Sequence, residues 1–405
     1  MTTTEVRHAV RLSGRDIGVL RQRGDHVVFT FLPEYWEDPD RHVLGLWFED
    51  HPRSHVGSAL RVPAWFSNLL PEGRLRDYIA ADRGVSPQRD MEILAQVGHD
   101  LPGAVEVVDG EGLDLPWHDG RPETPPQGID LPSGSVKFSL AGVGLKFSMR
   151  RQGERFTIPA SGQDGGQWIV KLPDPEHRFV PQNEFAMMSL AKQVGIDVPD
   201  IHLVHRDDTF GLPEHVWPQG EELAYAVRRF DRGPDGARVH IEDLAQVRGF
   251  HADKKYAGTF ETVAALCFRG TDIDSLHEFV RRMTFNLIIG NGDAHLKNWS
   301  LIYPDGRNPR ISPAYDLVST VPYNDQDDLG LKFGHGRRFE DVSLATFDRL
   351  ARKLGLPDDH RLAELASATY ATLASAWDPA EMSKEIGFVG SWIEKSIAGA
   401  APRLR

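Results

Sequence analysis

The sequence predicts an α+β fold with two lobes, one rich in strands and one helical, and a small α+β unit before them. Three observations support this prediction. Runs of β-branched and alternating residues, typical of strands, fill much of 1–108 and 135–230. Segments with the apolar spacing of helices dominate 231–405. A stretch dense in Pro, Gly and acidic residues, 109–134, separates the first unit from the rest, as a linker would.

Composition narrows the classes of function. The chain has 405 residues, of which 40% are hydrophobic and 26% charged, as expected for two or three folded domains. A net charge of −13 argues against nucleic acid or an anionic membrane as a partner of the whole surface. The single cysteine, Cys267, permits no internal disulfide and no cysteine zinc site. The sequence has no apolar run of the ~20 residues that a membrane helix needs and no signal-peptide core. We therefore expect a cytoplasmic protein without a membrane partner.

The first unit, 1–108, is predicted to open with hairpins. Alternating runs are "VRHAVRL", "IGVLRQ" and "HVVFTFL", and the turn signal "RGD" separates the last two. A helix, a proline stop and a second helix are predicted from "AWFSNLLPEGRLRDYIAADRG". A helix that ends near Gly98, followed by a strand, is predicted from "MEILAQVGHDLPGAVEVV". This unit is followed by the linker, 109–134.

Strand signals return in 135–230, the predicted strand-rich lobe. The strands are "SVKFS", "LKFSM", "FTIP" and "QWIVKLP", then, after the helix "QNEFAMMSLAKQVG", "IHLVHR" and "LAYAVRRF". The helical lobe, 231–405, is predicted from "SLHEFVRRMTFNLIIG", "LATFDRLARKLG", "HRLAELASATYATLASAW" and "EIGFVGSWIEKSIAG". A cleft where two such lobes meet is a common ligand site.

A polar loop follows the first long helix of this lobe, in "GNGDAHLKNWSLIY" at 290–303. It runs from Asp293 to Asn298, and a strand, a turn and a returning strand then bring Asp316 back towards it. Phosphoryl transfer needs an Asp to accept the proton of the attacking hydroxyl, and Asp and Asn oxygens to hold magnesium. The spacing D-x-x-x-x-N matches the catalytic loop of protein kinases. Lys297, beside Asn298 in this chain, could reach the transferring phosphoryl group. From spacing alone, an Asx-rich capping turn, with Asp316 as a capping residue, is the alternative.

Two upstream features favour phosphate chemistry. Lys171 lies in the apolar strand "QWIVKLP", where burial is costly unless the lysine meets an anion. Protein kinases place such a lysine against nucleotide phosphates and pair it with a helix glutamate, here Glu184; an edge-strand lysine that reaches water is the alternative. In "SLAGVGLKFSM", 139–149, Gly142 and Gly144 would let backbone N–H groups approach phosphate oxygens. The order of these elements predicts a protein-kinase-like fold.

The chain resembles the HipA family, bacterial serine/threonine kinases of toxin–antitoxin systems. The resemblance covers nearly the whole chain. In the two lobes it rests on "SLAGVGLK", "WIVKLP", "NEFAMMSLAKQVGIDVP", "RRFDR", "NGDAHLKNWSL" and "SPAYDLVS". In the first unit it rests on "WFSNLLPEG" and "ILAQVGHDLPGAV", so 1–108 resembles the family's N-terminal subdomain.

The resemblance implies a role for each site residue. Asp293 would be the catalytic residue, Asn298 and Asp316 would hold Mg2+, and Glu184 would support the lysine that contacts ATP. Ser139 falls where these kinases phosphorylate themselves, which ejects the glycine loop and silences the enzyme. The implied ATP-binding residues are Ala141, Gly142, Val143, Gly144, Leu145, Lys146, Lys171, Arg228, Arg229, Phe230, His295 and Lys297. Among them, the strand end from Val227 to Phe230 would read adenine through its backbone, and His295 would also have a structural place in the loop.

The sequence departs from the family pattern at two positions. The family usually has Gln where Gly144 stands and Glu where Arg228 stands, which bears on phosphate contacts and on nucleotide preference. The resemblance also implies a helix-turn-helix antitoxin of the HipB type as a partner, DNA contact only through that partner, and an aminoacyl-tRNA synthetase as one kind of protein substrate. Two other functions are compatible with the residues: a kinase-fold co-repressor with weak catalysis, and a small-molecule phosphotransferase.

Overall fold

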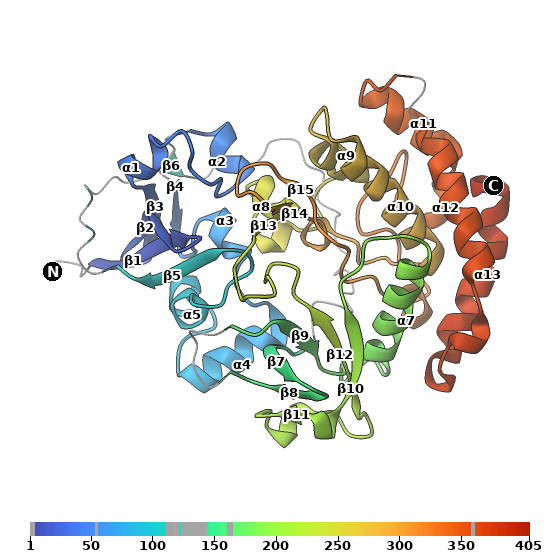
Figure 1. Cartoon of the computed structure of the whole chain (residues 1–405), viewed down its shortest axis with the longest axis horizontal. Helices are drawn as coiled ribbons and strands as arrows, with labels where there is room; N and C mark the ends of the chain where they lie inside the picture. The colour runs from blue at the N-terminus through green and yellow to red at the C-terminus, as the bar shows by residue number, and fades with distance from the viewer. Residues whose placement is uncertain are drawn as a thin grey trace.

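The structure is a computed structural model that describes residues 5–52, 56–110, 113, 115, 121–122, 144–159, 165–357 and 361–405. The N-terminal unit, the strand-rich lobe and the helical lobe meet around the centre of the molecule (Figure 1). This arrangement is the α+β, two-lobed kinase-like fold that the sequence predicts. No helix in the described ranges has both the length and the apolar character that crossing a bilayer requires.

The N-terminal unit is a six-stranded sheet covered by short helices. Its strands lie in the order β5-β1-β2-β3-β4-β6 and are β1 (Glu5–Leu12), β2 (Arg15–Arg23), β3 (His26–Phe31), β4 (Val56–Ala59), β5 (Val105–Asp109) and β6 (Arg121–Pro122). Its helices are α1 (Pro33–Trp36), α2 (Leu46–Asp50), α3 (Ala64–Ser67), α4 (Gly73–Arg83) and α5 (Asp90–Val97). The predicted hairpins, the helix–proline–helix segment and the helix before Gly98 are confirmed. Because β6 pairs with β4, part of the predicted linker belongs to this sheet.

The strand-rich lobe is a second six-stranded sheet with one long helix. Its strand order is β10-β12-β9-β7-β8-β11. The elements are β7 (Lys146–Gln152), β8 (Arg155–Thr157), β9 (Trp168–Lys171), α7 (Val180–Gln193), β10 (Ile201–His205), β11 (Thr209–Phe210) and β12 (Leu223–Arg228). Helix α7 packs on β10 and β12 through Met187, Met188 and Ala191, which are fully buried. The predicted strand "SVKFS" lies outside the described residues.

The helical lobe contains α8 (Leu244–Val247), α9 (Phe260–Phe268), α10 (Ile273–Ile289), α11 (Leu344–Lys353), α12 (Leu362–Ala376) and α13 (Gly387–Leu404). Helices α11 to α13 lie on the side away from the N-terminal unit (Figure 1). Cys267 is buried, and burial raises the pKa of its thiol to about 12. The lobe also holds a three-stranded sheet of β13 (His240–Asp243), β14 (Ser300–Tyr303) and β15 (Arg310–Ile311); the pairing of β14 with β15 confirms the predicted hairpin, and β13 was not predicted.

A buried carboxylate joins the N-terminal unit to this small sheet. Glu242 in β13 is fully buried and accepts hydrogen bonds from the N–H of Leu46 (2.9 Å), from the indole N–H of Trp65 (3.1 Å) and from the hydroxyl of Tyr303. Burial raises the pKa of Glu242 to about 7. Since a buried carboxyl group is costly unless polar partners satisfy it, the two sides of the junction depend on each other.

Candidate active site

The loop of residues 291–298 begins where α10 ends. Gly290 closes the helix with a φ of +64°, and a Cβ there would lie 2.3 Å from the ring of Trp392, so both backbone and packing require glycine. The apolar face that anchors this helix in the core consists of Leu276, Val280, Met283 and Leu287, all buried. The position of the loop is therefore set by a well-packed helix.

Asp293 is almost fully buried, and the loop holds its backbone in place. Its N–H donates to Oδ1 of Asn291 (3.1 Å), and its carbonyl accepts from the side-chain amide of Asn298 (2.9 Å) and from the N–H of His295 (2.7 Å). The hydroxyl of Tyr256 donates to the Asp293 carboxylate. Because the Asn298 amide nitrogen binds inside the loop, the oxygen of that amide is the atom suited to a cation.

His295 is a weak base in this position. Its Nε2 lies 3.9 Å from Oδ1 of Asp293, and its ring packs edge-on against Tyr256 with centroids 5.1 Å apart. Burial, and next the positive charge of Lys255, lower the pKa of His295 to about 3. The imidazole is therefore neutral at pH 7, in agreement with a structural place in the loop, although it also lines the cleft.

Lys171 ends β9 and lies between two carboxylates. Its Nζ is 2.7 Å from Oε1 of Glu184 and 2.5 Å from Oδ1 of Asp316. Strand β9 has neighbours on both sides, which excludes the alternative of an edge-strand lysine. Burial opposes the charge of each carboxylate, but Lys171 and then Lys146 lower the pKa of Asp316. Burial, with the nearby charge of Asp316, raises the pKa of Glu184. Of the two carboxylates, Asp316 is therefore the one whose negative charge the two lysines favour.

Two lysines face each other across the sheet at the cleft. Lys146 in β7 is the cross-strand partner of Lys171 in β9. Like charges placed directly opposite each other destabilise a sheet. Desolvation beside the cleft, and next the charge of Lys171, lower the pKa of Lys146, although the residue as a whole is exposed. An anion bound between the two ammonium groups would remove this repulsion, so the pair suits the phosphates of a nucleotide.

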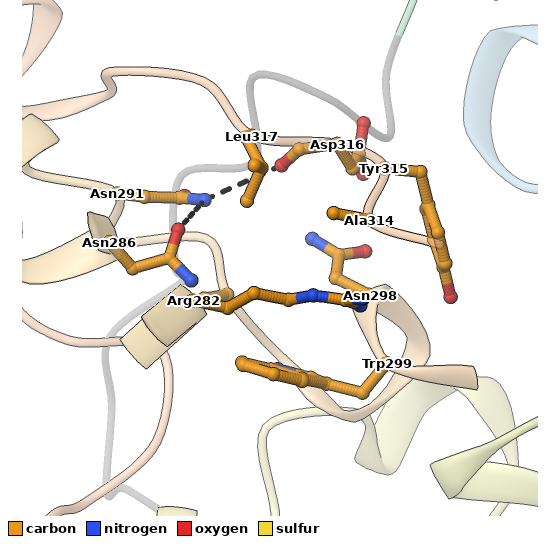
Figure 2. Close-up of a pocket in the computed structure, with 10 residues that line it drawn as sticks. Arg282, Asn286, Asn291, Asn298, Trp299, Ala314, Tyr315, Asp316 and Leu317 are labelled. Carbon is orange, nitrogen blue, oxygen red and sulfur yellow. Dashed lines mark hydrogen bonds between the residues drawn. The ribbon is translucent and has the colours of Figure 1, made fainter. Parts of the chain in front are cut away.

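Asp316 reaches the site from an irregular segment. The sequence predicts a returning strand up to Asp316, but β15 ends at Ile311, and Asp316 has a left-handed φ of +61°. Asp is one of the few non-glycine residues that adopt this conformation readily. Figure 2 shows Asn291 between α10 and this segment: its amide donates to Oδ1 of Asn286 (2.9 Å) and to the carbonyl of Asp316 (3.4 Å). The end of the helix and the segment that carries Asp316 are therefore tied together.

Asn298 and Asp316 line the same small pocket, of about 10 Å³ (Figure 2). The described residues hold no cluster of three or more His, Cys, Asp or Glu placed to bind a metal. Mg2+ commonly uses only one or two carboxylates, with oxygens of water and phosphate completing its shell. A carboxylate and an amide oxygen in one pocket fit that pattern, so the donor set suits Mg2+ in the presence of a phosphate ligand.

A cleft of about 660 Å³ joins these groups and is large enough for a nucleotide. Both lobes and the N-terminal unit line it. The strand-rich lobe contributes Lys146, Ile169 and Lys171, and the loop contributes His295, Lys297 and Asn298. The N-terminal unit contributes Asn68, Glu72, Leu75 and Tyr78. The sequence patterns did not predict that these four residues line the site. The only signal in the sequence was the quoted motif "WFSNLLPEG", which contains Asn68 and Glu72.

The strand end that was predicted to read adenine, Val227 to Phe230, is partly engaged in contacts inside the protein. The N–H of Arg228 donates to Asp200 (2.8 Å), and the N–H of Arg229 donates to Gln167 (2.9 Å), both at carbonyl oxygens. The Arg229 side chain is buried and bridges Asp100 and Asp231 at 2.8 and 2.9 Å. A ligand at this edge would therefore meet the backbone of Phe230 and carbonyl groups rather than these two N–H groups. The Phe230 ring itself packs against Tyr315, with centroids 5.8 Å apart.

The glycine turn lies mostly outside the described residues, which do not include Ser139, Ala141, Gly142 and Val143. Its described end is attached to β9, because the N–H of Leu172 donates to the carbonyl of Leu145 (2.8 Å). The Leu145 side chain is buried in the core of the strand-rich lobe. A Cβ on Gly144 would lie 3.5 Å from the carbonyl oxygen of Leu172, an ordinary contact, so space does not require glycine there.

Comparison with known families gives one match for the N-terminal unit and another for most of the two lobes. Residues 138–377 match the model described as HipA-like C-terminal domain, and residues 8–108 match the HipA N-terminal domain. The Sinorhizobium fredii protein Y4dM is 42% identical over 381 residues, which cover 91% of this chain and 90% of the relative. The serine/threonine-protein kinase toxin HipA of Shewanella oneidensis is 31% identical over 336 residues, covering 74% and 72%.

A solved structure shares the fold. It is a chain of the complex of HipA, HipB and operator DNA from Shewanella oneidensis MR-1, with a TM-score of 0.74 and 24% sequence identity. The match covers 98% of this chain and 97% of that one.

Proposed function

Because this chain belongs to the HipA family of kinases, we propose that it is an ATP- and magnesium-dependent serine/threonine protein kinase. The observation that carries the proposal is the pair Lys146 and Lys171, which face each other in a cleft that also holds Asn298 and Asp316. The lysines suit the phosphates, and the two oxygen donors suit the metal that accompanies them. Asp293 lies in the same loop as Asn298 and supplies the group that a phosphoryl acceptor needs.

In the proposed reaction, Asp293 orients an acceptor hydroxyl and takes its proton as the oxygen attacks the γ-phosphorus of ATP. The new bond joins this oxygen to phosphorus, and the bond between the γ-phosphorus and the β–γ bridging oxygen breaks, so ADP leaves. In this structure the hydroxyl of Tyr256 donates a hydrogen bond to the Asp293 carboxylate. The hydroxyl of the phosphoryl acceptor would donate to the same carboxylate. The charge of Asp293 is thus kept beside a hydrogen-bond donor before the acceptor arrives.

Asp316 and Lys171 would exchange partners when the nucleotide binds. In this structure they form an ion pair, so neither is committed to a ligand. Asn298 and Asp316 would hold Mg2+, which when bound neutralises charge on the phosphates. Lys171 would then turn from Asp316 to the phosphates while keeping Glu184, 2.7 Å away. Lys297 would reach the transferring phosphoryl group from the other side.

The partner and the acceptors are further parts of this proposal. Family membership supports a helix-turn-helix antitoxin of the HipB type, and the net charge of −13 suits a basic partner. The proposed acceptors are Ser139 of the chain itself and a host protein, with an aminoacyl-tRNA synthetase as the first candidate. The pure protein should be incubated with γ-labelled ATP, magnesium and a host lysate, with Asp293→Asn as the control. Transfer of label to a serine by the wild type alone supports the proposal. Label on a small molecule would instead favour a small-molecule phosphotransferase, and no transfer at all would favour a kinase-fold co-repressor.

A further inference from the structure

The N-terminal unit reaches into the cleft through one acidic side chain. Glu72 stands at the N-cap position of α4, yet among the described residues its carboxylate makes no capping hydrogen bond. Its oxygens lie instead 2.9 Å from Nζ of Lys297 and 3.3 Å from Nζ of Lys255. The residues that usually cap a helix start are Asp, Asn, Ser and Thr, and Glu is not one of them. Glu72 is used for a contact between two parts of the chain.

The N-terminal unit supplies most of the bonds that hold Lys297. Its Nζ donates to the carbonyl of Asn68 (2.9 Å) and lies 3.3 Å from Oδ1 of the same residue. Asp243 of the helical lobe is more distant, at 3.7 Å. A lysine side chain is flexible and loses rotamer entropy when it is fixed, so these contacts decide where its charge lies.

The second lysine extends the network to the other side of the loop. The carbonyl of Lys255 accepts the N–H of Leu296 (3.0 Å), and the next residue, Tyr256, donates to the carboxylate of Asp293. Burial favours the neutral form of Glu72, but Lys297 and Lys255 outweigh it and lower its pKa to about 2. Glu72 is therefore ionised at every working pH and attracts both lysines that flank the loop.

We propose that Glu72 is a positioning residue of the phosphoryl-transfer site, through which the N-terminal unit fixes Lys297 beside the transferring group. The inference rests on the proposed kinase function. It assigns the N-terminal unit a part in the chemical step, because Lys297 would act on the group that moves. Binding of ATP would depend mainly on Lys146 and Lys171. Glu72 interacts with Lys146 only through its charge, and more weakly than with Lys297 and Lys255.

The test is Glu72→Gln, which keeps the size of the side chain and removes its charge. We expect kcat to fall roughly tenfold, with KM for ATP changed less than twofold, because positioning of a reacting group affects the step rather than binding. Glu72→Asp, which keeps the charge on a shorter stem, should recover part of the loss. Glu49→Gln is the matched control: Glu49 lies in the same unit, has a similar exposure (32% against 33%) and pairs with Arg41 at 2.7 Å. It should keep wild-type kinetics.

A double-mutant cycle shows whether Glu72 acts through Lys297. In a Lys297→Met background, Glu72→Gln should reduce kcat far less than in the wild type, since the group that it positions is gone. An equal loss in both backgrounds would overturn the inference, as would an unchanged or higher kcat in the single variant. Thermal melting of every variant identifies a loss of folded protein. If Glu72→Gln does not fold, the kcat of Glu72→Asp is compared with that of the wild type instead. If the wild type itself transfers no phosphate, the kinase proposal fails, and that result is distinct from a wild type that works and a Glu72→Gln variant that equals it.

Discussion

Lys171 and Asp316 form an ion pair across the cleft, with 2.5 Å between Nζ and Oδ1, although one belongs to the strand-rich lobe and the other to the helical lobe. The pair is one of the contacts that join the two lobes, with the hydrogen bonds between Asn183 and Ser319. A nucleotide with its metal would replace this single contact by two: phosphates at the lysine and a cation at the carboxylate. Binding would thus exchange partners rather than bury unpaired charges.

Asp293→Asn tests the proton acceptor. The substitution preserves shape, so the protein should fold and bind ATP as the wild type does, whereas transfer should fall by roughly 100-fold or more. Autophosphorylation with labelled ATP measures the rate, and calorimetry measures binding. A variant that labels itself at the wild-type rate would show that another group accepts the proton.

Asp316→Ala tests the metal role. Removal of a cation ligand should weaken ATP binding in the presence of magnesium and have little effect without it. Lys171→Ala should weaken binding under both conditions, because the lysine would contact the phosphates directly. Calorimetric titration of both variants, with magnesium and with a chelator, separates the two effects. Equal magnesium dependence in wild type and Asp316→Ala would contradict the assignment.

Tyr256→Phe tests the bond that keeps the buried Asp293 carboxylate satisfied. The ring stays in place, but the carboxylate loses a donor, so the free energy of unfolding should fall by about 1–3 kcal/mol. Denaturant unfolding of the ligand-free protein measures this loss. The control is Tyr256→Phe combined with Asp293→Asn, in which the charge is absent and the loss should be smaller. The account is wrong if the single variant is as stable as the wild type.

Ser139 should carry phosphate after incubation with ATP, and the modified form should be inactive. A phosphate adds nearly two negative charges next to the turn "AGVGLK" and would repel the phosphates of ATP. Intact-mass and peptide spectra, followed by activity of the separated forms, give the result. Full activity in a completely modified sample would rule out this form of silencing, and modification confined to other residues would exclude the site.

Alone, the protein should bind DNA poorly and should join a DNA complex through a basic partner. At −13, it would be repelled by the duplex, because DNA affinity comes mainly from Lys and Arg at the phosphates. A gel-shift titration at physiological salt should compare kinase alone, partner alone and both together. Sequence-specific binding by the kinase alone would refute the prediction. A partner band that does not shift further when kinase is added would refute it as well.

The sequence predicts the fold well where local rules decide the structure. Alternation and turn residues predict the hairpins of the N-terminal unit, and helical spacing predicts α10 with its buried face and its glycine end. Strand β13, "HIED", was missed because three of its four residues are polar or charged. Glu242 is tolerated there because Leu46 and Trp65, far away in the chain, satisfy its carboxylate.

Only the parts of the site that depend on residue spacing within a motif could be predicted from the sequence. The spacing Asp293–Asn298 and the pairing of Lys171 with Glu184 could be read from motifs, and the structure has both the loop and the ion pair. The contact of Glu72 with Lys297 could not be predicted from motifs, because it depends on how two units dock rather than on either segment alone. For the same reason, the contact of the buried Arg229 side chain with Asp100 of the N-terminal unit was not foreseen.

The N-terminal unit has a boundary in amino-acid composition but not in folding free energy, because Glu242 joins it to the rest of the chain. Composition changes sharply after residue 108, as it does between independent modules. The free energy of folding does not divide there, since separation would leave Glu242 without Leu46 and Trp65 while it still holds Tyr303. The two parts are therefore expected to melt in one cooperative transition. Exchange of either part between related chains would succeed only if the matching half of this junction were carried along with it.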